Sequence, residues 1–236
     1  MKIVIASISR AHLLDCAREL QKRGHDVTFF SITPPKNLKR YGMTNGGKSL
    51  LLYIFPFYLL QHIFPSDATR RIYSFMLDCF VYVCMPPCDV FIAQSPNYQM
   101  SILRAKRKYK ALTILDRGSS HVRTFNRLRK EYSLPPQDES YQRRDEREYN
   151  TVDYVAIASD FVYNTFVENK FPKERLFINP YGVSLQHFSS TVCTNEFDCI
   201  VVGSWSRRKG SHLIVEAFQN SSQGSACRNC LRCSLP

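Results

Sequence analysis

Three consecutive cations, Arg207, Arg208 and Lys209, lie in a short loop that is bracketed by Gly203 and Gly210. Gly203 ends an apolar run with strand character, and Gly210 stands just before a segment with helical spacing. Backbone N–H groups at the positive end of a helix dipole bind phosphate, and the three cations strengthen this field. We therefore expect the loop to bind phosphate and to stabilise negative charge on a departing phosphate group. An ordinary basic turn between a strand and a helix fits the same spacing.

A second glycine-rich segment, Gly42–Ser49, fits the pattern G-x-x-x-x-G-K-S of nucleotide-binding P-loops. A P-loop follows directly after a hydrophobic strand. The residues before this segment, PPKNLKRY, are too polar to form a buried strand, so we interpret the match as a coincidence.

The amino-terminal residues of the chain have the pattern of a strand–helix–strand unit. Residues 2–7 are an apolar run with strand character, and the apolar residues of 11–23 repeat at helical spacing. Gly24 fits the end of this helix, and residues 26–32 form a second apolar run. Such units build parallel sheets with helices on the outside.

The same alternation returns after residue 88 and completes the pattern of a domain. It predicts strands over residues 89–95, 111–116, 153–159 and 175–180, helices over 97–108 and 161–169, and a polar helical region broken at Pro135 and Pro136. This order predicts an α/β fold, with a complete doubly wound, Rossmann-like domain.

The domain organisation follows from breaks in these patterns. Residues 1–190 are expected to form the complete N-terminal domain. Residues 189–196 are polar and irregular, which indicates a linker. An apolar run over 197–203 and the helical spacing after it predict the first strand–helix unit of a second Rossmann-like domain over residues 197–220.

The last segment, residues 221–236, is predicted to be an irregular tail that contains cysteines. Cys227, Cys230 and Cys233 have the spacing that begins an iron–sulfur run, but the fourth ligand and its context do not follow. We expect neither a metal site nor a cofactor from this chain.

The net charge of +12 predicts anionic partners such as nucleotide phosphates or an acidic membrane leaflet. Nucleic acid is excluded as a partner because the basic runs lack interleaved aromatic residues and any recognition motif. The nine cysteines are an odd number, and no long apolar segment follows Met1. A reducing, cytoplasmic location is therefore expected, with peripheral contact to the inner membrane face as an addition.

The segment Leu50–Phe64 is strongly apolar, but it is too short to span a bilayer and is interrupted by Pro56 and Gln61. A buried helix is the interpretation that we favour, because buried helices of this length are common. The other interpretation is an apolar lip near an acceptor site that touches membrane.

Four stretches, in this order, resemble the retaining glycosyltransferases of family four, which have the GT-B fold. They are KIVIAS with ARELQKRGHDVTFFS, EREYNTVDYVAIASDFVYNTF (146–166), INPYGVSLQHF (178–188) and VVGSWSRRKGSHLIVEAF (201–218). The resemblance covers nearly all of residues 1–218. It implies two Rossmann-like domains across a cleft, with the nucleotide-sugar donor on the C-terminal domain and the acceptor on the N-terminal domain. Transfer in this family retains the anomeric configuration and normally needs no metal.

The resemblance also implies roles on the donor side. Lys209 would contact the donor diphosphate, and Gly203 would allow close approach of the backbone. Ser204 stands where the family often has arginine, so Arg207 or Arg208 would supply that cation.

On the acceptor side, SISRAH replaces the Gly-Gly loop that often follows the first strand of the family. Arg10 and His12 would bind an acceptor group, or they belong to a solvated loop. His121 follows the strand ALTILD, where the family commonly has a histidine that faces the reacting sugar. It is the candidate catalytic residue, and a histidine at the surface start of a helix fits equally.

The sequence thus predicts a glycosyltransferase that moves a sugar from a nucleotide-sugar donor to a saccharide or glycolipid acceptor, with retention. The family's donor-binding Glu-x7-Glu segment is not found in residues 1–236, so a truncated donor domain with doubtful activity is expected. The alternative function is a non-catalytic acceptor domain that binds a membrane or another subunit.

Overall fold

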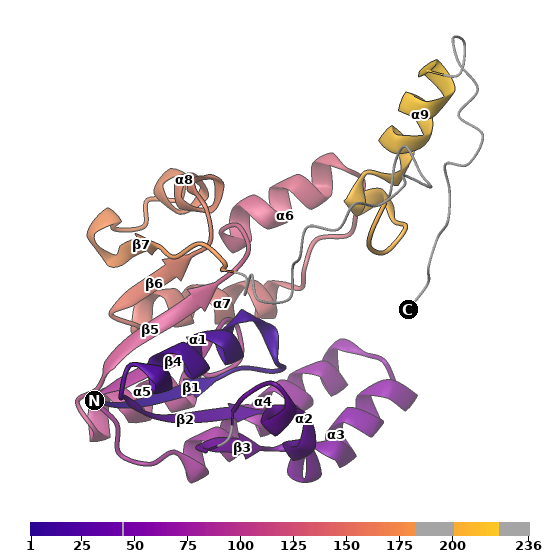
Figure 1. Cartoon of the computed structure of the whole chain (residues 1–236). Helices are drawn as coiled ribbons and strands as arrows, with labels where there is room; N and C mark the ends of the chain where they lie inside the picture. Colours follow the sequence, from indigo (N-terminus) through magenta and orange to yellow (C-terminus); the bar gives the residue numbers. More distant parts are fainter. Residues whose placement is uncertain (44, 183–200, 222–236) are drawn as a thin grey trace, which may run out of the picture. The chain divides into compact units, whose positions relative to one another are not determined.

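The computed structural model describes residues 1–43, 45–182 and 201–221 of the chain (Figure 1). The chain divides into two compact units, Met1–Gly182 and Val183–Pro236. The predicted domain end at residue 190 lies outside the described residues. The predicted tail 221–236 also lies outside them, except for Ser221, which ends the last described helix.

The first unit is built on a parallel sheet of seven strands in the order β3-β2-β1-β4-β5-β6-β7. The strands are β1 (Lys2–Ala6), β2 (Asp26–Ser31), β3 (Gly47–Ser49), β4 (Val90–Gln94), β5 (Leu112–Arg117), β6 (Tyr154–Ile157) and β7 (Leu176–Ile178). All six neighbouring pairs are parallel, and in the centre Val4 of β1 pairs with Thr28 and with Phe91. The predicted α/β class is confirmed, and the short edge strand β3 is an addition.

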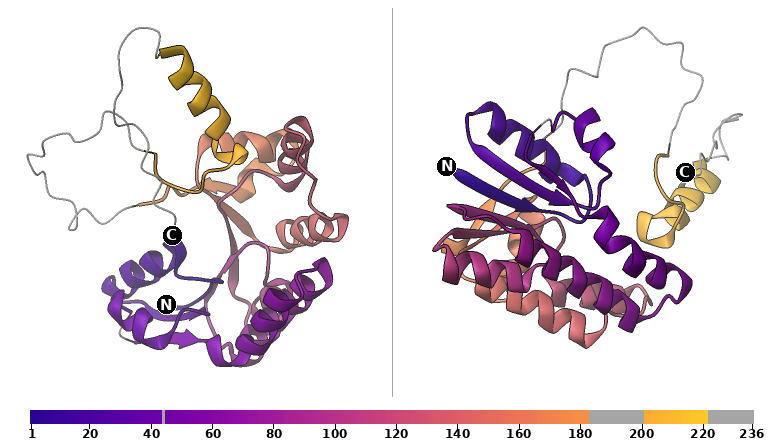
Figure 2. Two further views of the ribbon diagram at one scale, coloured as in Figure 1. Left: turned by 90° about the vertical axis from the view of Figure 1, so that its right-hand side faces the viewer. Right: turned by 90° about the horizontal axis from the view of Figure 1, so that it is seen from below.

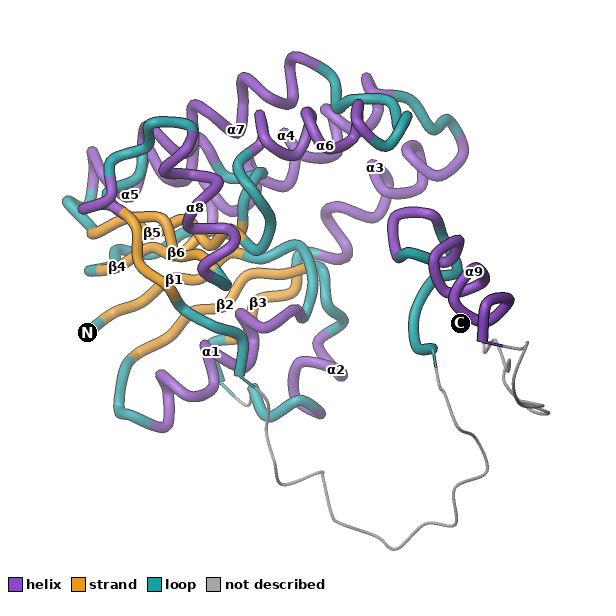
Figure 3. Tube along the Cα trace, turned by 90° about the horizontal axis from the view of Figure 1, so that it is seen from above, coloured by secondary structure: helices purple, strands orange, loops and turns teal. Residues whose placement is uncertain are grey.

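The helices of this unit connect the strands. They are α1 (Ala11–Lys22), α2 (Pro35–Arg40), α3 (Leu51–Ile63), α4 (Asp67–Cys84), α5 (Gln99–Lys108), α6 (Val122–Glu131), α7 (Glu139–Thr151) and α8 (Asp160–Glu168), with the short 3-10 helix η1 (Lys173–Arg175). In Figure 3, α1 and α2 cover one face of the sheet, and α4 and α7 cover the other.

The core lies on both faces of the sheet because successive side chains of a strand point to opposite sides. In β1, Ile3 and Ile5 pack with the residues of α1, whereas Val4 and Ala6 pack with those of α4 and α5. The inner strands are nearly continuous apolar runs, as expected for a parallel sheet that is covered on both faces.

The P-loop-like segment does not have the fold of a P-loop. The residues before it include α2 rather than a buried strand, as the polar composition predicted. Lys48 lies in the edge strand β3 and is exposed.

The prediction that Leu50–Phe64 forms a buried helix is wrong in its burial, although the segment is a helix. Ile54 is the one buried residue within α3, while Leu52 is 86% and Phe64 is 63% exposed. The reason is the position of α3, which follows the edge strand β3 and packs mainly against α4. The two helices form a hairpin (Figure 2, purple). None of the described helices is long and apolar enough to cross a membrane.

The described part of the second unit consists of the 3-10 helix η3 (Arg207–Lys209) and helix α9 (Ser211–Ser221). The helix that was predicted after Gly210 is therefore present. The predicted strand over 197–203 lies partly outside the described residues, and its described end, Val201–Gly203, has no strand structure. A strand needs a hydrogen-bonded neighbour, and the described residues of this unit contain no second strand.

Candidate functional site

The strand order reverses at the carboxyl ends of β1 and β4. The chain leaves β1 toward β2 and β3 on one side, and it leaves β4 toward β5, β6 and β7 on the other side. Ligands of open α/β sheets bind where the strand order reverses in this way. The two strand ends are joined there, because Ser7 Oγ donates to Gln94 Oε1 at 2.8 Å and Ile8 N donates to the same oxygen at 3.0 Å.

His12 and Asp116 meet at this end of the sheet. His12 lies in the first turn of α1, and Asp116 lies near the end of β5. His12 Nε2 is 2.8 Å from Asp116 Oδ2, and the two side chains are 23% and 7% exposed. Since a carboxylate accepts, Nε2 carries the proton in this pair, which leaves Nδ1 as an acceptor. The arrangement can fix an imidazole so that it takes a hydrogen bond from a substrate hydroxyl.

Tyr181 closes one side of the pair. Its ring centroid is 4.0 Å from that of His12. A Cβ atom on Gly118 would lie 2.0 Å from Tyr181 Oη, so a larger residue at this position would force the Tyr181 ring to shift. Burial, followed by the charge of Asp116, raises the pKa of Tyr181, so its hydroxyl stays protonated.

Arg10 lies two residues before His12, at the start of α1, and is exposed. Its guanidinium lies over the ring of Tyr41, with 4.0 Å between Cζ and the ring centroid. Between them, Ala11 has a φ of 32°, a conformation that residues with side chains rarely adopt. The turn therefore holds Arg10 and His12 on one short, strained segment, and such strain is concentrated at functional sites.

His121, the candidate catalytic residue, lies at the start of α6. It is the N-cap of α6 and is buried, with Nδ1 accepting from Arg123 N at 3.3 Å. Tyr149 and Phe166 pack on its ring, with centroids at 5.3 and 5.0 Å. Burial lowers the pKa of His121 to about 4. A neutral ring with its proton on Nε2 can donate one hydrogen bond, but it cannot exchange a proton near neutral pH.

Arg117 positions the loop that joins Asp116 to His121. Its guanidinium pairs with Asp145 Oδ2 at 2.9 Å, and both side chains are almost fully buried. It also donates to Ser95 Oγ at 3.2 Å and to the Ser120 carbonyl at 3.3 Å. Arg117 thus links the loops after β4 and β5 to helix α7.

The cationic loop of the second unit is exposed at Gly203, Arg207 and Lys209. Gly203 has a φ of 131°, which only glycine adopts freely. Lys209 N donates to Ser206 O at 2.9 Å, and Gly210 N donates to Arg207 O at 3.0 Å. These two N–H groups are used inside the turn, so a phosphate here would depend more on the side-chain cations than the sequence indicated.

Sequence reasoning missed Asp116, Tyr181 and Gln94 as parts of the site. Asp116 and Gln94 both lie where predicted strands end, and that position was the signal that could have found them. The approach of Tyr181 to His12 joins residues far apart in the chain, so no local pattern indicates it. Among the described residues, no group of three or more His, Cys, Asp or Glu side chains could hold a metal ion.

Comparison with known sequences gives one family. Residues 10–187 match the family model described as Glycosyltransferase Family 4. No curated protein matches the sequence.

Comparison with solved structures gives likeness in fold. Anabaena Alr3699/HepE in complex with UDP-glucose has a TM-score of 0.51 and 12% identity, over 81% of this chain and 47% of that chain. The same protein in complex with UDP and glucose has a TM-score of 0.51 and 14% identity over the same shares. UDP-GlcNAc 2-epimerase from Methanocaldococcus jannaschii has a TM-score of 0.48 and 12% identity, over 75% of this chain and 45% of that one. The chain thus spans about half the length of these proteins, and the GT-B-type α/β fold that was expected is confirmed.

Proposed function

This chain belongs to Glycosyltransferase Family 4, and from that premise we propose that it transfers a sugar from a nucleotide-sugar donor to a saccharide or lipid-linked acceptor, with retention. In this reaction the bond between the anomeric carbon and the diphosphate breaks, and its electron pair leaves with the diphosphate. The acceptor oxygen forms the new glycosidic bond and releases its proton. Peripheral contact with the inner membrane face, from the cytoplasm, belongs to the same proposal.

The single observation that carries the proposal is the His12–Asp116 pair at the strand-order reversal. Asp116 fixes the imidazole, and His12 Nδ1 accepts a hydrogen bond from the acceptor hydroxyl. Arg10, two residues away and exposed, supplies a cation for an anionic group on the acceptor. Acceptor binding at the loop after β1, which the sequence predicted, is therefore part of the proposal.

The donor belongs to the second unit. Lys209, with Arg207 and Arg208, balances the charge that grows on the departing diphosphate, and Gly203 lets the backbone approach it. The UDP-glucose complex of Anabaena Alr3699/HepE, which shares the fold, supports a nucleotide-sugar as the donor. His121 remains the candidate that contacts the reacting sugar, and as a neutral ring it would donate a hydrogen bond from Nε2.

A second candidate is a non-catalytic domain that binds an acceptor, a membrane or another subunit. The observation behind it is the exposed apolar helix α3, because such a surface marks a contact with a protein or a membrane.

The test is sugar transfer by the complete protein from a panel of nucleotide-sugars to lipid and saccharide acceptors, compared with Asp116→Asn. We expect transfer with at least one pair of substrates and a large loss in the variant. Vesicle or subunit binding without transfer from any donor would favour the non-catalytic function.

A further inference from the structure

Helix α3 exposes an apolar surface to solvent. Residues 50–65 contain no Asp, Glu, Lys or Arg, and they include five aromatic side chains. Phe55, Leu59 and Ile63, spaced one turn apart, are 52%, 43% and 57% exposed. Contiguous exposed apolar surface of this kind marks a contact with a protein or a membrane.

Helix α4 extends the apolar surface. Ile72, Phe75, Tyr82 and Val83 are exposed at helical spacing along it. The other side of α4 is buried in the core through Leu77 and similar residues. We call the exposed apolar side chains of α3 and α4, together with Phe64 at the end of α3, the apolar face.

An arginine-lined cavity of about 770 Å³ lies between the start of α4 and helix α7. Six arginines line it, against three carboxylates, and they are Arg70, Arg71, Arg129, Arg143, Arg144 and Arg147, with Asp67, Asp138 and Glu139. The cavity therefore has an excess of three positive charges and fits an anion.

The pairings inside the cavity leave half of its arginines without a carboxylate. Arg70 pairs with Asp67 at 3.1 Å, Arg71 with Asp138 at 3.2 Å, and Arg143 with Glu139 at 2.6 Å. Arg144 donates to Ser74 Oγ, and Arg129 donates to the Pro135 carbonyl. Within the described part of the chain, the guanidinium of Arg147 has no hydrogen-bond or ion-pair partner. The exposed pairs are weak, so their arginines remain available to an anion as well.

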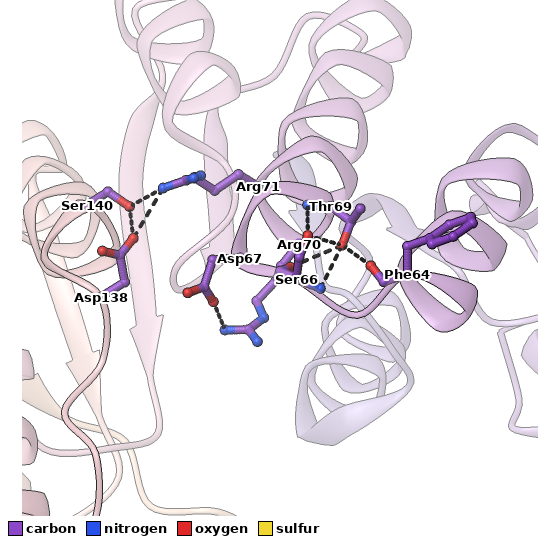
Figure 4. Close-up of polar contacts among 8 residues, drawn as sticks. All are labelled: Phe64, Ser66, Asp67, Thr69, Arg70, Arg71, Asp138 and Ser140. Carbon is purple, nitrogen blue, oxygen red and sulfur yellow. Dashed lines mark hydrogen bonds and ion pairs between the residues drawn. The ribbon is translucent and has the colours of Figure 1, made fainter.

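Figure 4 shows the turn between α3 and α4, which joins Phe64 to two arginines that line the cavity. Phe64 caps the end of α3, and its carbonyl accepts from Thr69 Oγ1 at 2.7 Å. Arg70 and Arg71 follow directly, and Arg71 reaches Asp138 and Ser140 at the start of α7. An exposed phenylalanine thus borders the group of arginines.

We propose that the apolar face and the arginine-lined cavity together dock on a bilayer, with the cavity holding the phosphate of an anionic lipid headgroup. The inference rests on the membrane contact of the proposed function and names its surface and ligand. A bilayer presents phosphate charges directly beside an apolar layer, which is the order that Arg70, Phe64 and Ile63 follow. A second copy of the chain would place the same excess of positive charge against itself, which is unfavourable.

The test is vesicle sedimentation of the full chain, with phosphatidylcholine vesicles that lack or contain about a quarter of phosphatidylglycerol. Arg70→Gln with Arg147→Gln removes two cations, each worth about fivefold in binding, so affinity for the anionic vesicles should fall roughly 25-fold. The matched control is Arg107→Gln with Lys108→Gln on α5. This pair is exposed, and Lys108 lies in a hollow with Met1 and Asp89 at the amino edge of the sheet. The control should bind within about threefold of the natural chain.

The apolar face is tested with Phe55→Gln, Leu59→Gln and Ile63→Gln together. These side chains are exposed, so the fold should hold, and vesicle binding should fall tenfold or more. The matched control is Leu112→Gln, Phe161→Gln and Ile178→Gln together. These three side chains lie on other elements and are exposed to a similar extent as those of α3. This control should leave binding unchanged.

Three outcomes would overturn the inference: no binding to anionic vesicles, equal loss in the cavity variant and its control, or no effect of the α3 variant. Binding of soluble glycerol 3-phosphate without vesicle binding would also overturn it, as would loss of a dimer in the α3 variant without vesicle binding. The assay contains no sugar donor or acceptor. Failure of the inference is therefore distinguishable from failure of the proposed transferase activity.

Discussion

His12 Nε2 lies 2.8 Å from Asp116 Oδ2, and this contact joins the start of helix α1, which follows β1, to strand β5. Strand β4 lies between β1 and β5 in the sheet. Because parallel strands end at one edge, residues 104 positions apart come within hydrogen-bond distance there. The pair places a polarised imidazole where the strand order reverses.

Asp116→Asn should lower the rate of sugar transfer by about tenfold or more, because an amide fixes the His12 tautomer less firmly than a carboxylate does. Steady-state transfer assays measure this effect. Glu19→Gln on α1 is the control, because Glu19 is exposed and pairs only with its neighbours Lys22 and Arg18. Equal rates for the two variants would show that His12 and Asp116 have only a structural role.

His121 should stay neutral down to about pH 4, because burial lowers its pKa from 6.5 to about 4. Its contribution to the free energy of unfolding is therefore present above pH 6.5 and is lost as the pH falls through about 4. NMR titration of the imidazole C–H signals measures the midpoint. A midpoint near the ordinary value of 6.5 would contradict the buried position of the ring.

Glu148 should make the protein less stable as the pH rises. The side chain is fully buried, and burial raises its pKa to about 8 from 4.5. The folded state therefore binds the extra proton between these values, and the stability that it gives below pH 4.5 is lost as the pH rises through about 8. Urea unfolding of Glu148→Gln should show a smaller fall in unfolding free energy from pH 5 to 8 than the natural chain shows. Parallel pH profiles for the two proteins would refute this prediction.

Asp145→Ala should destabilise the fold by about 3–5 kcal/mol, because it leaves the buried Arg117 guanidinium without its charge partner. Denaturant unfolding measures the change. The control is Glu139→Ala, whose partner Arg143 is exposed, and it should cost less than about 1 kcal/mol. A similar small cost for both variants would mean that Arg117 is solvated in solution.

Much of the first unit could be predicted from the sequence, because its strands and helices have clear periodicity. The helix over 11–23, the strand over 111–116 and the breaks at Pro135 and Pro136 all have counterparts in the structure. Edge strand β3 has only three residues and no apolar run, so no pattern indicated it. The exposure of α3 could not be predicted either, because apolar composition reports the preference of a helix for burial and not whether a neighbour covers it.

The site was predictable only in part. His12 and Arg10 were found because they follow the first strand, whereas the contacts with Asp116 and Tyr181 depend on the packing of the whole sheet. His121 was predicted to face the reacting sugar, and its burial against Phe166 comes from helix α8, which the local sequence does not reveal. The donor-binding roles that the family resemblance implies in the second unit remain predictions. They concern Gly203, Arg207, Arg208 and Lys209.

The most direct measurement of the central claim is a thermal shift of the complete protein with a panel of nucleotide-sugars. A ligand at about 100 times its Kd stabilises the folded state by about 2.7 kcal/mol. We predict a rise in Tm with at least one nucleotide-sugar, and loss of most of that rise in Lys209→Ala, with Lys110→Ala as an unaffected control. No rise in Tm with any nucleotide-sugar, or an equal rise in Lys209→Ala, would contradict the assignment of the donor site.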